Sequence, residues 1–421
     1  MSASTFRAFR NRNYALFFGG QSVSQIGTWM QRTAVSWVIY SLTHSAFMLG
    51  LSVFAQQFPS FLLSLPGGVI ADRYSRYKIL LITQTASMIQ AILLAVLILT
   101  NHYVIWEIMA LSVMLGIINA FDVPARQPMV HEMVDNKEDI QNALALNSAM
   151  VNIARLVGPA LSGIVLELFG AGVCFSLNAL SFVAVIASLL LMKFPAFNPP
   201  AIKKNVTAEL SEGFAYLKQT PAISIVILMM IFLSLLVFPY DTMVPVFAKV
   251  IFKGDAATFG YISSFVGLGA ILASLFLASA KKGANLNRIL TATTIILGIG
   301  LIFFSQISYF PVAMFFATLI GFGSLTPMTT CITIIQMEAA PNMRGRVMSY
   351  VALAYFGMLP LGSLVVGTIS QKIGAPLTML FQGIIAILIA AVFANILRRE
   401  ALTKKAKAEL DEADRIVVQK I

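Results

Sequence analysis

Long uninterrupted apolar segments recur along this chain, and they restrict its fold more than any other feature. An α-helix needs about 20 apolar residues to cross the hydrocarbon core of a membrane. The 421 residues are 58% hydrophobic and only 11% charged, which is too little charge to cover a soluble protein of this length. A membrane β-barrel would instead show segments of about ten residues with alternating polarity. The sequence therefore predicts an all-α integral membrane protein.

Twelve apolar segments can be distinguished, six before and six after a polar stretch. The first six lie at 13–41, 46–71, 79–99, 104–123, 142–167 and 173–193. The second six lie at 222–248, 258–280, 289–307, 310–336, 347–370 and 376–397. We expect twelve transmembrane helices in two pseudo-symmetric six-helix bundles, formed by residues 1–193 and 221–397.

The polar stretch 194–220 is expected to be a cytoplasmic linker between the bundles. Thr207 is a candidate N-cap, and Leu210, Phe214 and Leu217 follow it at helical spacing. These features predict a short amphipathic helix over residues 207–218. The last residues, 398–421, are expected to form a charged cytoplasmic tail.

Basic residues are distributed unevenly among the polar segments. With both termini in the cytoplasm, the outer loops hold only Lys249, Lys253 and Lys372, and all other loop cations fall on the cytoplasmic side. This bias sets the orientation of membrane proteins and accounts for the net charge of +11. The basic residues form no groove interleaved with aromatic residues, so we do not expect nucleic acid as a partner. We expect a monomer that crosses the cytoplasmic (inner) membrane many times, with the lipid bilayer as its main partner.

A short charged loop follows the second apolar segment. It contains the run Gly68–Tyr77, with the sequence GVIADRYSRY. This run resembles the loop signature Gly-x-Leu-Ala-Asp-Arg-x-Gly-Arg-Lys/Arg of the major facilitator superfamily. Ser75 stands where the signature has glycine, and Tyr77 stands where it has a cation, with Lys78 one place later.

Further stretches carry the resemblance along the whole chain up to the tail. Gly27–Gln31, Phe121–Gln127 and Arg344–Ser349 are similar to the branch of the superfamily that includes enterobactin and other siderophore exporters. Gly158–Gly163, in the fifth apolar segment, resembles the Gly-Pro signature of proton-driven exporters. The resemblance implies a transporter that works by alternating access, with the proton as coupling ion. The basic residue that many proton-coupled members carry midway along the fourth helix is missing, so an uncoupled facilitator or importer is an alternative.

The loop signature is expected to act on conformation. In the superfamily, an acid at the inner end of the fourth helix completes a charge cluster with this loop, which implies that Asp122 joins Asp72 and Arg76. We expect these three residues to form a cytoplasmic latch. The alternative is that they are interfacial charges that only hold the topology. The full predicted cluster is Gly68, Asp72, Arg73, Arg76, Asp122 and Arg126.

Two charges within apolar segments share a depth in the membrane. Arg32 and Asp241 each lie about two-thirds of the way outward along the first and seventh segments, and a charge at this depth is costly, about 2.5–3.5 kcal/mol on insertion scales. In the superfamily these helices face each other, so we expect an ion pair near the outer gate. Protonation of Asp241, or a charged substrate, would remove the attraction. The alternative is that each charge reaches water separately.

Arg155 and Asn152 share one face of the fifth predicted helix. A guanidinium group binds carboxylates with two hydrogen bonds, so Arg155 is a candidate for an anionic group of the substrate. The alternative is a structural partner, such as a carbonyl group or Glu107. The other candidate cavity residues are polar or aromatic side chains in apolar segments: Gln25, Trp29, Gln57, Asn119, Tyr240, Gln336 and Tyr355.

The sequence contains no constellation typical of catalysis, a metal site or ATP binding. Cys174 and Cys331 both lie in apolar segments, where inert thiols are expected. We therefore expect no enzyme and no cofactor. The expected function is secondary active export of a small amphipathic molecule, siderophore-like or drug-like, as an antiporter with protons. A membrane scaffold or sensor on a transporter fold is the alternative from another class.

Overall fold

The computed structural model describes residues 6–101, 103–194, 206–280 and 283–396, and within these ranges the chain is entirely helical apart from turns and short connections. Ten of its helices are long and apolar enough to cross a membrane, or eleven if the bent pair α2 and α3 forms one span. The helix α1 has 32 residues, but its polar side chains lower its hydropathy below that of the others. The predicted tail, 398–421, and residues 195–205 of the predicted linker lie outside the described residues.

Helices before the linker form what we call the first half. They are η1 (Arg7–Arg10), α1 (Arg12–Thr43), α2 (Ala46–Leu62), α3 (Ser64–Arg73), α4 (Arg76–Leu99), α5 (Ile105–Glu132), α6 (Lys137–Phe169) and α7 (Ala171–Leu191). The predicted second helix is bent by 47° between α2 and α3. The predicted fourth helix continues past residue 123 to Glu132, so Arg126 lies within a helix and not in a loop.

Helices after the linker form the second half. They are α9 (Pro221–Leu236), η2 (Phe238–Met243), α10 (Val244–Val246), η3 (Phe247–Ile251), α11 (Ala256–Ser279), α12 (Leu286–Gln306), α13 (Phe310–Glu338), α14 (Arg344–Ala352), η4 (Leu353–Gly357), α15 (Met358–Ile373) and a last helix at Ala375–Ile396. Asp255 caps α11 by accepting a hydrogen bond from the Thr258 backbone N–H (2.9 Å), which lowers the pKa of the Asp255 carboxyl.

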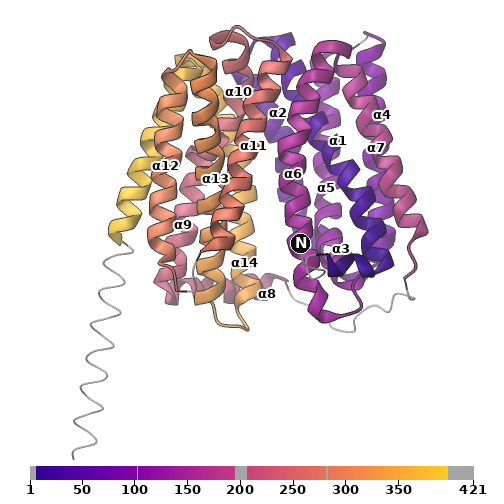
Figure 1. Cartoon of the computed structure of the whole chain (residues 1–421). Helices are drawn as coiled ribbons and strands as arrows, with labels where there is room; N and C mark the ends of the chain where they lie inside the picture. The colour runs from indigo at the N-terminus through magenta and orange to yellow at the C-terminus, as the bar shows by residue number, and fades with distance from the viewer. Residues whose placement is uncertain (1–5, 102, 195–205, 281–282, 397–421) are drawn as a thin grey trace, which may run out of the picture.

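The two halves lie side by side, with the helices roughly parallel to a common direction (Figure 1). In the first half α1 packs on α6 and α7, and α4 packs on α5 and α7. In the second half α13 packs on α11 and α12. Two helix pairs make the most extensive contacts between the halves, α6 with α11 and α2 with α15. Figure 1 shows α3, α8 and α14 at one end of the molecule, which we call the α8 end, and α10 at the opposite end, which we call the α10 end.

Glycines bring the joining helices into close contact near the α10 end. A Cβ atom at Gly163 of α6 would lie 2.9 Å from the Ala256 carbonyl oxygen and 3.1 Å from Gly260 Cα of α11. A Cβ atom at Gly50 of α2 would overlap the Ser363 carbonyl oxygen of α15. Small residues allow this close approach of backbones, which is how membrane helices associate without a hydrophobic driving force.

Two helices of the second half are broken where they face each other. Pro239, which has no N–H, stands in η2, and the side chain of Gln382 donates hydrogen bonds to the carbonyl groups of Leu236 and Val237 (3.3 Å each). In the facing helix, α14 and α15 are joined by η4, a π-helical turn that ends at Gly357, three residues before Pro360. The rings of Phe238 and Tyr355 meet across these breaks, 6.2 Å apart. Irregular backbone at membrane depth is tolerated where protein buries it or a watery cavity lies beside it.

The linker contains α8 (Val206–Gln219), which begins one residue before the predicted N-cap Thr207. The helix docks on the start of α14: Tyr350 Oη donates to the Leu210 carbonyl (2.9 Å), and Glu212 pairs with Arg346 (2.7 Å). On the predicted apolar face Leu217 is buried, whereas Phe214 stays 52% exposed beside the Tyr350 ring. The linker helix therefore belongs to the second half by its contacts.

Candidate functional site

An ion pair between Arg32 of α1 and Asp241 of η2 lies between the halves. Arg32 Nη2 is 3.5 Å from Asp241 Oδ2, and their side chains are 36% and 50% exposed. Of the six ion pairs among described residues, this one joins the halves; four lie within the first half and one joins α8 to α14. Asp241 sits at the break in its helix, where the 3₁₀ turn of η2 replaces the α-helical backbone.

Trp29 lies against two guanidinium groups. The Arg32 group is 5.1 Å from the centre of its ring, and the Arg155 group is 5.2 Å from it. The contact between α1 and α6 is close here, because a Cβ atom at Gly158 would overlap Trp29 Cβ. A guanidinium group on an indole face is attracted by the ring quadrupole, by about 0.5–1 kcal/mol at exposed sites. Trp29 therefore holds Arg32 and Arg155 near one another although they come from different helices.

Tyr240 extends this group into the second half. It is buried, and its hydroxyl donates to Ser324 Oγ of α13 (3.3 Å). It directly precedes Asp241 in η2. We call Trp29, Arg32, Arg155, Tyr240 and Asp241 the central group. The structure thus brings together five residues that the sequence singles out, with two positive charges and one negative charge among them.

In the described structure, the remaining predicted cavity residues make no hydrogen bond, ion pair or ring contact with the central group. Asn152 donates to Ser274 Oγ of α11 (3.0 Å) and so joins the halves. Gln336 is exposed near the end of α13 and contacts Met348, at the α8 end, which makes it a poor candidate for a central cavity. Gln25, Gln57, Asn119 and Tyr355 are half-buried within their helices. Their role in substrate binding stays a prediction.

A buried amide network, which the sequence analysis missed, fixes α1 next to the central group. Gln31 donates to Gln90 Oε1 of α4 (2.9 Å) and accepts from Asn178 of α7 (2.7 Å). Gln90 in turn donates to the Leu111 carbonyl of α5 (3.1 Å). All three side chains are nearly inaccessible. A signal was available, because Gln90 and Asn178 stand in apolar segments, where a polar side chain needs a partner on another helix.

The predicted latch at the α8 end divides into two clusters. Asp122 is buried: its Oδ1 accepts from Thr83 (2.9 Å) and Gln84 (2.7 Å), and its Oδ2 pairs with Arg126 (3.2 Å). Arg76 does not reach it. A single cluster of Asp72, Arg76 and Asp122 is therefore wrong for this conformation, because helical spacing favours Arg126 as the partner of Asp122.

Arg76 is instead the centre of a second, more exposed cluster. It pairs with Asp72 (3.6 Å) and makes a short contact with Glu132 at the end of α5, a partner that the sequence analysis missed. Arg73 is exposed, and none of the described residues pairs with it. A Cβ atom at Gly68 would meet nothing, whereas one at Gly67 would overlap the Ala120 carbonyl oxygen. The residue that lets α3 approach α5 is therefore Gly67 and not Gly68.

Contacts near the α10 end hold the halves together. The Trp37 ring of α1 stacks on Phe259 of α11 (6.1 Å), and Lys249 of η3 lies over the same Trp37 ring (5.5 Å). Ser45 donates to Gln371 Oε1 of α15 (3.0 Å). Together with the glycine contacts, these interactions join the halves at this end.

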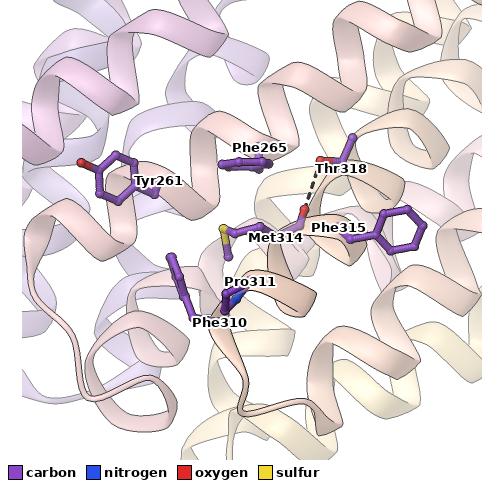
Figure 2. Close-up of a pocket in the computed structure, with 7 residues that line it drawn as sticks. All are labelled: Tyr261, Phe265, Phe310, Pro311, Met314, Phe315 and Thr318. Carbon is purple, nitrogen blue, oxygen red and sulfur yellow. Dashed lines mark hydrogen bonds between the residues drawn. The ribbon is translucent and has the colours of Figure 1, made fainter.

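A separate pocket of about 620 Å³ lies between α11 and α13. Figure 2 shows its lining, with Thr318 donating within its own helix to Met314. None of the predicted cavity residues lines it, and its walls are almost entirely apolar; they consist of Tyr261, Phe265, Phe310, Pro311, Met314, Phe315 and Thr318. Substrate sites place a few convergent polar groups in an apolar setting, so the central group is the better candidate.

Comparison with known proteins identifies relatives over nearly the whole chain. A family model described as transmembrane secretion effector, within the major facilitator superfamily, matches residues 3–419. The staphyloferrin A transporter of Staphylococcus aureus is 27% identical, covering 94% of this chain and 98% of its own length. Macrolide efflux protein A of Streptococcus pyogenes is 21% identical, covering 89% and 93%. The enterobactin exporter EntS of Salmonella typhimurium is 26% identical, covering 81% and 80%.

Solved transporter structures share the fold. A POT family transporter in complex with 5-aminolevulinic acid superimposes with a TM-score of 0.71 at 14% identity, covering 92% of this chain and 97% of its own. The relatives are membrane transporters and not enzymes. This chain is accordingly a multi-pass membrane transporter with a small-molecule substrate, and its bacterial relatives imply the cytoplasmic membrane.

Proposed function

Because the chain belongs to the transmembrane secretion effector family of the major facilitator superfamily, we propose that it exports a small amphipathic molecule by alternating access, in exchange for protons. The observation that carries this proposal is the ion pair between Arg32 and Asp241, which crosses from one half to the other. Siderophore and macrolide relatives support a siderophore-like or drug-like substrate.

The proposed architecture has twelve spans in two six-helix bundles. Adding α1 to the ten helices and the bent pair gives this number. The polar side chains that lower the hydropathy of α1 make contacts inside the protein: Gln31 bonds to α4 and α7, and Arg32 faces η2. Polar groups in this position suit a helix that borders a cavity and not lipid.

In the proposed orientation, the α8 end faces the cytoplasm and both termini lie on that side. The basic clusters around Arg76 and Arg126, and Arg346 with α8, gather at this end. The cytoplasmic loops of membrane proteins carry an excess of Lys and Arg. The same bias supports the cytoplasmic location of the linker.

The proposed conformation is open toward the cytoplasm. Glycine contacts, the Trp37–Phe259 stack and the Ser45–Gln371 hydrogen bond join the halves near the α10 end. At the α8 end, every ion pair among described residues stays within the first half or joins α8 to α14. Closure of the α8 end would then bring the exposed cluster of Asp72 and Arg76 toward the second half.

In the proposed coupling step, a proton from outside neutralises Asp241. Opposite charges attract by about 4 kcal/mol at 4 Å with an effective dielectric constant of 20. Both side chains are partly exposed, so screening reduces the benefit of the pair to about 1 kcal/mol or less. A coupling energy of this size shifts an equilibrium by about fivefold. The proton is therefore one of several contributions that bias the two conformations.

Transport by the purified full-length protein in proteoliposomes tests this function. The probes are staphyloferrin A, enterobactin and erythromycin, under an imposed pH gradient and without it. We expect the gradient to drive flux of at least one probe, and Asp241→Asn to abolish the response to the gradient. Asp255→Asn is the matched control, because Asn is also a good N-cap, and the lowered pKa of Asp255 keeps this carboxylate charged across the assay range.

Three outcomes contradict the proposal in different ways. Flux that ignores the gradient indicates a facilitator. A full response to the gradient in Asp241→Asn removes Asp241 from the coupling. A complete lack of flux for all three probes, in a protein that remains folded, argues against export of this substrate class.

A further inference from the structure

Arg155 carries a positive charge that no described acid neutralises. Asp241 is engaged by Arg32 at 3.5 Å. Glu107, the other acid that sequence reasoning considers as a partner, accepts the Val104 backbone N–H at the start of α5 (3.0 Å). The contact of Arg155 in the described structure is with the Trp29 ring. The central group therefore has one more positive than negative charge.

An excess charge at this depth needs a partner. Arg155 lies near the middle of α6, which spans Lys137–Phe169, and it is half-buried. A charged side chain at the centre of a membrane costs about 2.5–3.5 kcal/mol on insertion scales. Water in a cavity lowers this cost, and an anion in the cavity lowers it further, because the opposite charges attract strongly where the dielectric constant is low.

None of the described residues accepts a hydrogen bond from the Arg155 guanidinium group, whereas Arg32 pairs with Asp241. A guanidinium group carries five N–H donors, and its attraction to an aromatic ring supplies no hydrogen-bond acceptor for them. Both groups lie about 5 Å from the same ring, so their central carbon atoms are at most about 10 Å apart. One carboxylate can bind either group through two parallel hydrogen bonds, and a larger substrate can contact both.

We propose that Arg155, Arg32 and Trp29 form a binding site for a substrate that carries a carboxylate next to an aromatic or apolar body. The single negative charge of a carboxylate balances the single excess positive charge of the central group, and the indole of Trp29 offers an apolar surface beside it. Arg155 is the primary anion-binding residue, because Arg32 already has Asp241. This inference rests on the proposed transport function and names the substrate class of the same site.

Substrate binding is thereby linked to the ion pair between the halves. A carboxylate that also reaches Arg32 competes with Asp241 for its donors. Asp241 is then released from Arg32, which weakens the contact between α1 and η2. A neutral isostere of the same shape lacks this effect.

Equilibrium binding to the full-length protein in detergent tests the inference without any pH gradient. The Trp37→Phe and Trp106→Phe substitutions leave Trp29 as the single tryptophan, since the chain has three. The probes are phenylacetate and its neutral isostere phenylacetamide, and the readout is the fluorescence of Trp29. We expect phenylacetate to bind at least about tenfold more tightly than the amide.

Substitutions in the same background assign the preference to Arg155. Arg155→Gln is expected to remove the preference for phenylacetate, and Arg155→Lys to retain part of it, because lysine keeps the charge but lacks the planar donors. Lys249→Gln is the matched control, since in the native chain Lys249 contacts the ring at position 37 and not Trp29, so its loss should leave the preference unchanged. Gel filtration checks that each variant is folded and monodisperse.

Equal binding of the two probes, no saturable binding of phenylacetate, or an unchanged preference in Arg155→Gln overturns the inference. The result is independent of the transport assay. A protein that binds phenylacetate but shows no gradient-driven flux keeps the anion site and loses the antiport function. A protein with gradient-driven flux but no preference for the carboxylate keeps the antiport function and loses the anion site.

Discussion

At the scale of single residues, the central group depends on side chains that never touch a substrate. Arg32 follows Gln31 in α1, and Gln31 is tied to α4 and α7 by two hydrogen bonds. Buried amides of this kind hold a helix in one rotation about its axis, because any other rotation leaves them unpaired. Gln31 is therefore a positioning residue for Arg32.

The substitution Asn178→Leu tests this role. It leaves Gln31 Oε1 buried without the donor that Asn178 supplies at 2.7 Å. An unsatisfied buried polar group costs about 1–3 kcal/mol, so we expect a lower midpoint of thermal unfolding in detergent. Ser176→Ala is the control, because Ser176 bonds only to the Gly172 carbonyl of its own helix. An unfolding midpoint that is equal in Asn178→Leu and wild type would rule out the positioning role.

At the scale of secondary-structure elements, glycine contacts determine how closely the joining helices pack. The α2–α15 and α6–α11 pairs each contain such a contact, and its glycine, Gly50 or Gly163, lies in the half of α2 or α6 nearest the α10 end. The close approach allows many weak contacts between backbones, which membrane helices need for association. A single added methyl group therefore has a large effect at these positions.

Gly50→Ala and Gly68→Ala should have opposite effects on stability. The new methyl group at Gly50 overlaps the Ser363 carbonyl oxygen, so α15 must move, at a cost of about 1–3 kcal/mol. At Gly68, within α3, the methyl group meets nothing and should stabilise the helix by about 0.5–1 kcal/mol. Thermal unfolding in detergent measures both. The packing argument is wrong if the two variants shift the unfolding midpoint in the same direction.

At the scale of the whole molecule, the contacts that join the halves are concentrated away from the α8 end. The proposed transport cycle requires these contacts to break and the α8 end to close. Trp37 and Phe259 belong to different halves, and their rings are 6.1 Å apart. A covalent link at this place should prevent the opposite conformation from forming.

A protein with Trp37→Cys and Phe259→Cys, joined by a short bifunctional methanethiosulfonate, should lose transport and regain it after reduction. The two native cysteines, Cys174 and Cys331, are buried and should not react under brief labelling. Each single-cysteine variant treated with the same reagent serves as a control. Transport that continues in the cross-linked protein would show that these contacts do not need to separate.

The sequence predicted the helices well, because apolar length and charge bias are strong signals in a membrane protein. It also predicted that Arg32 and Asp241 would share a depth and lie close together. It was less successful with the charge clusters. Asp122 pairs with Arg126 on its own helix because α5 continues to Glu132, beyond the end of the apolar segment. An apolar segment marks the membrane thickness and not the end of the helix.

Other features of the site depend on tertiary packing that a sequence does not display. The position of Trp29 against Arg155 requires Gly158 to admit the α1 backbone. The sequence does not show that Gly158 and Gly68 differ, yet a Cβ atom would overlap a neighbour at Gly158 and would meet nothing at Gly68. The polarity of Gln336 predicts a place in the cavity, but its position near the end of α13 puts it at the α8 end.

The unequal number of charges in the central group makes the protein sensitive to membrane voltage. Moving one elementary charge through a potential of 100 mV changes the energy by about 2.3 kcal/mol. With an empty site, the group carries one net positive charge, or two when a proton neutralises Asp241, so a potential that is negative inside favours the conformation in which this charge is exposed to the cytoplasm. A bound carboxylate cancels the charge and removes the preference. The empty carrier should therefore reset at a rate that depends on voltage, while the loaded carrier crosses almost independently of it.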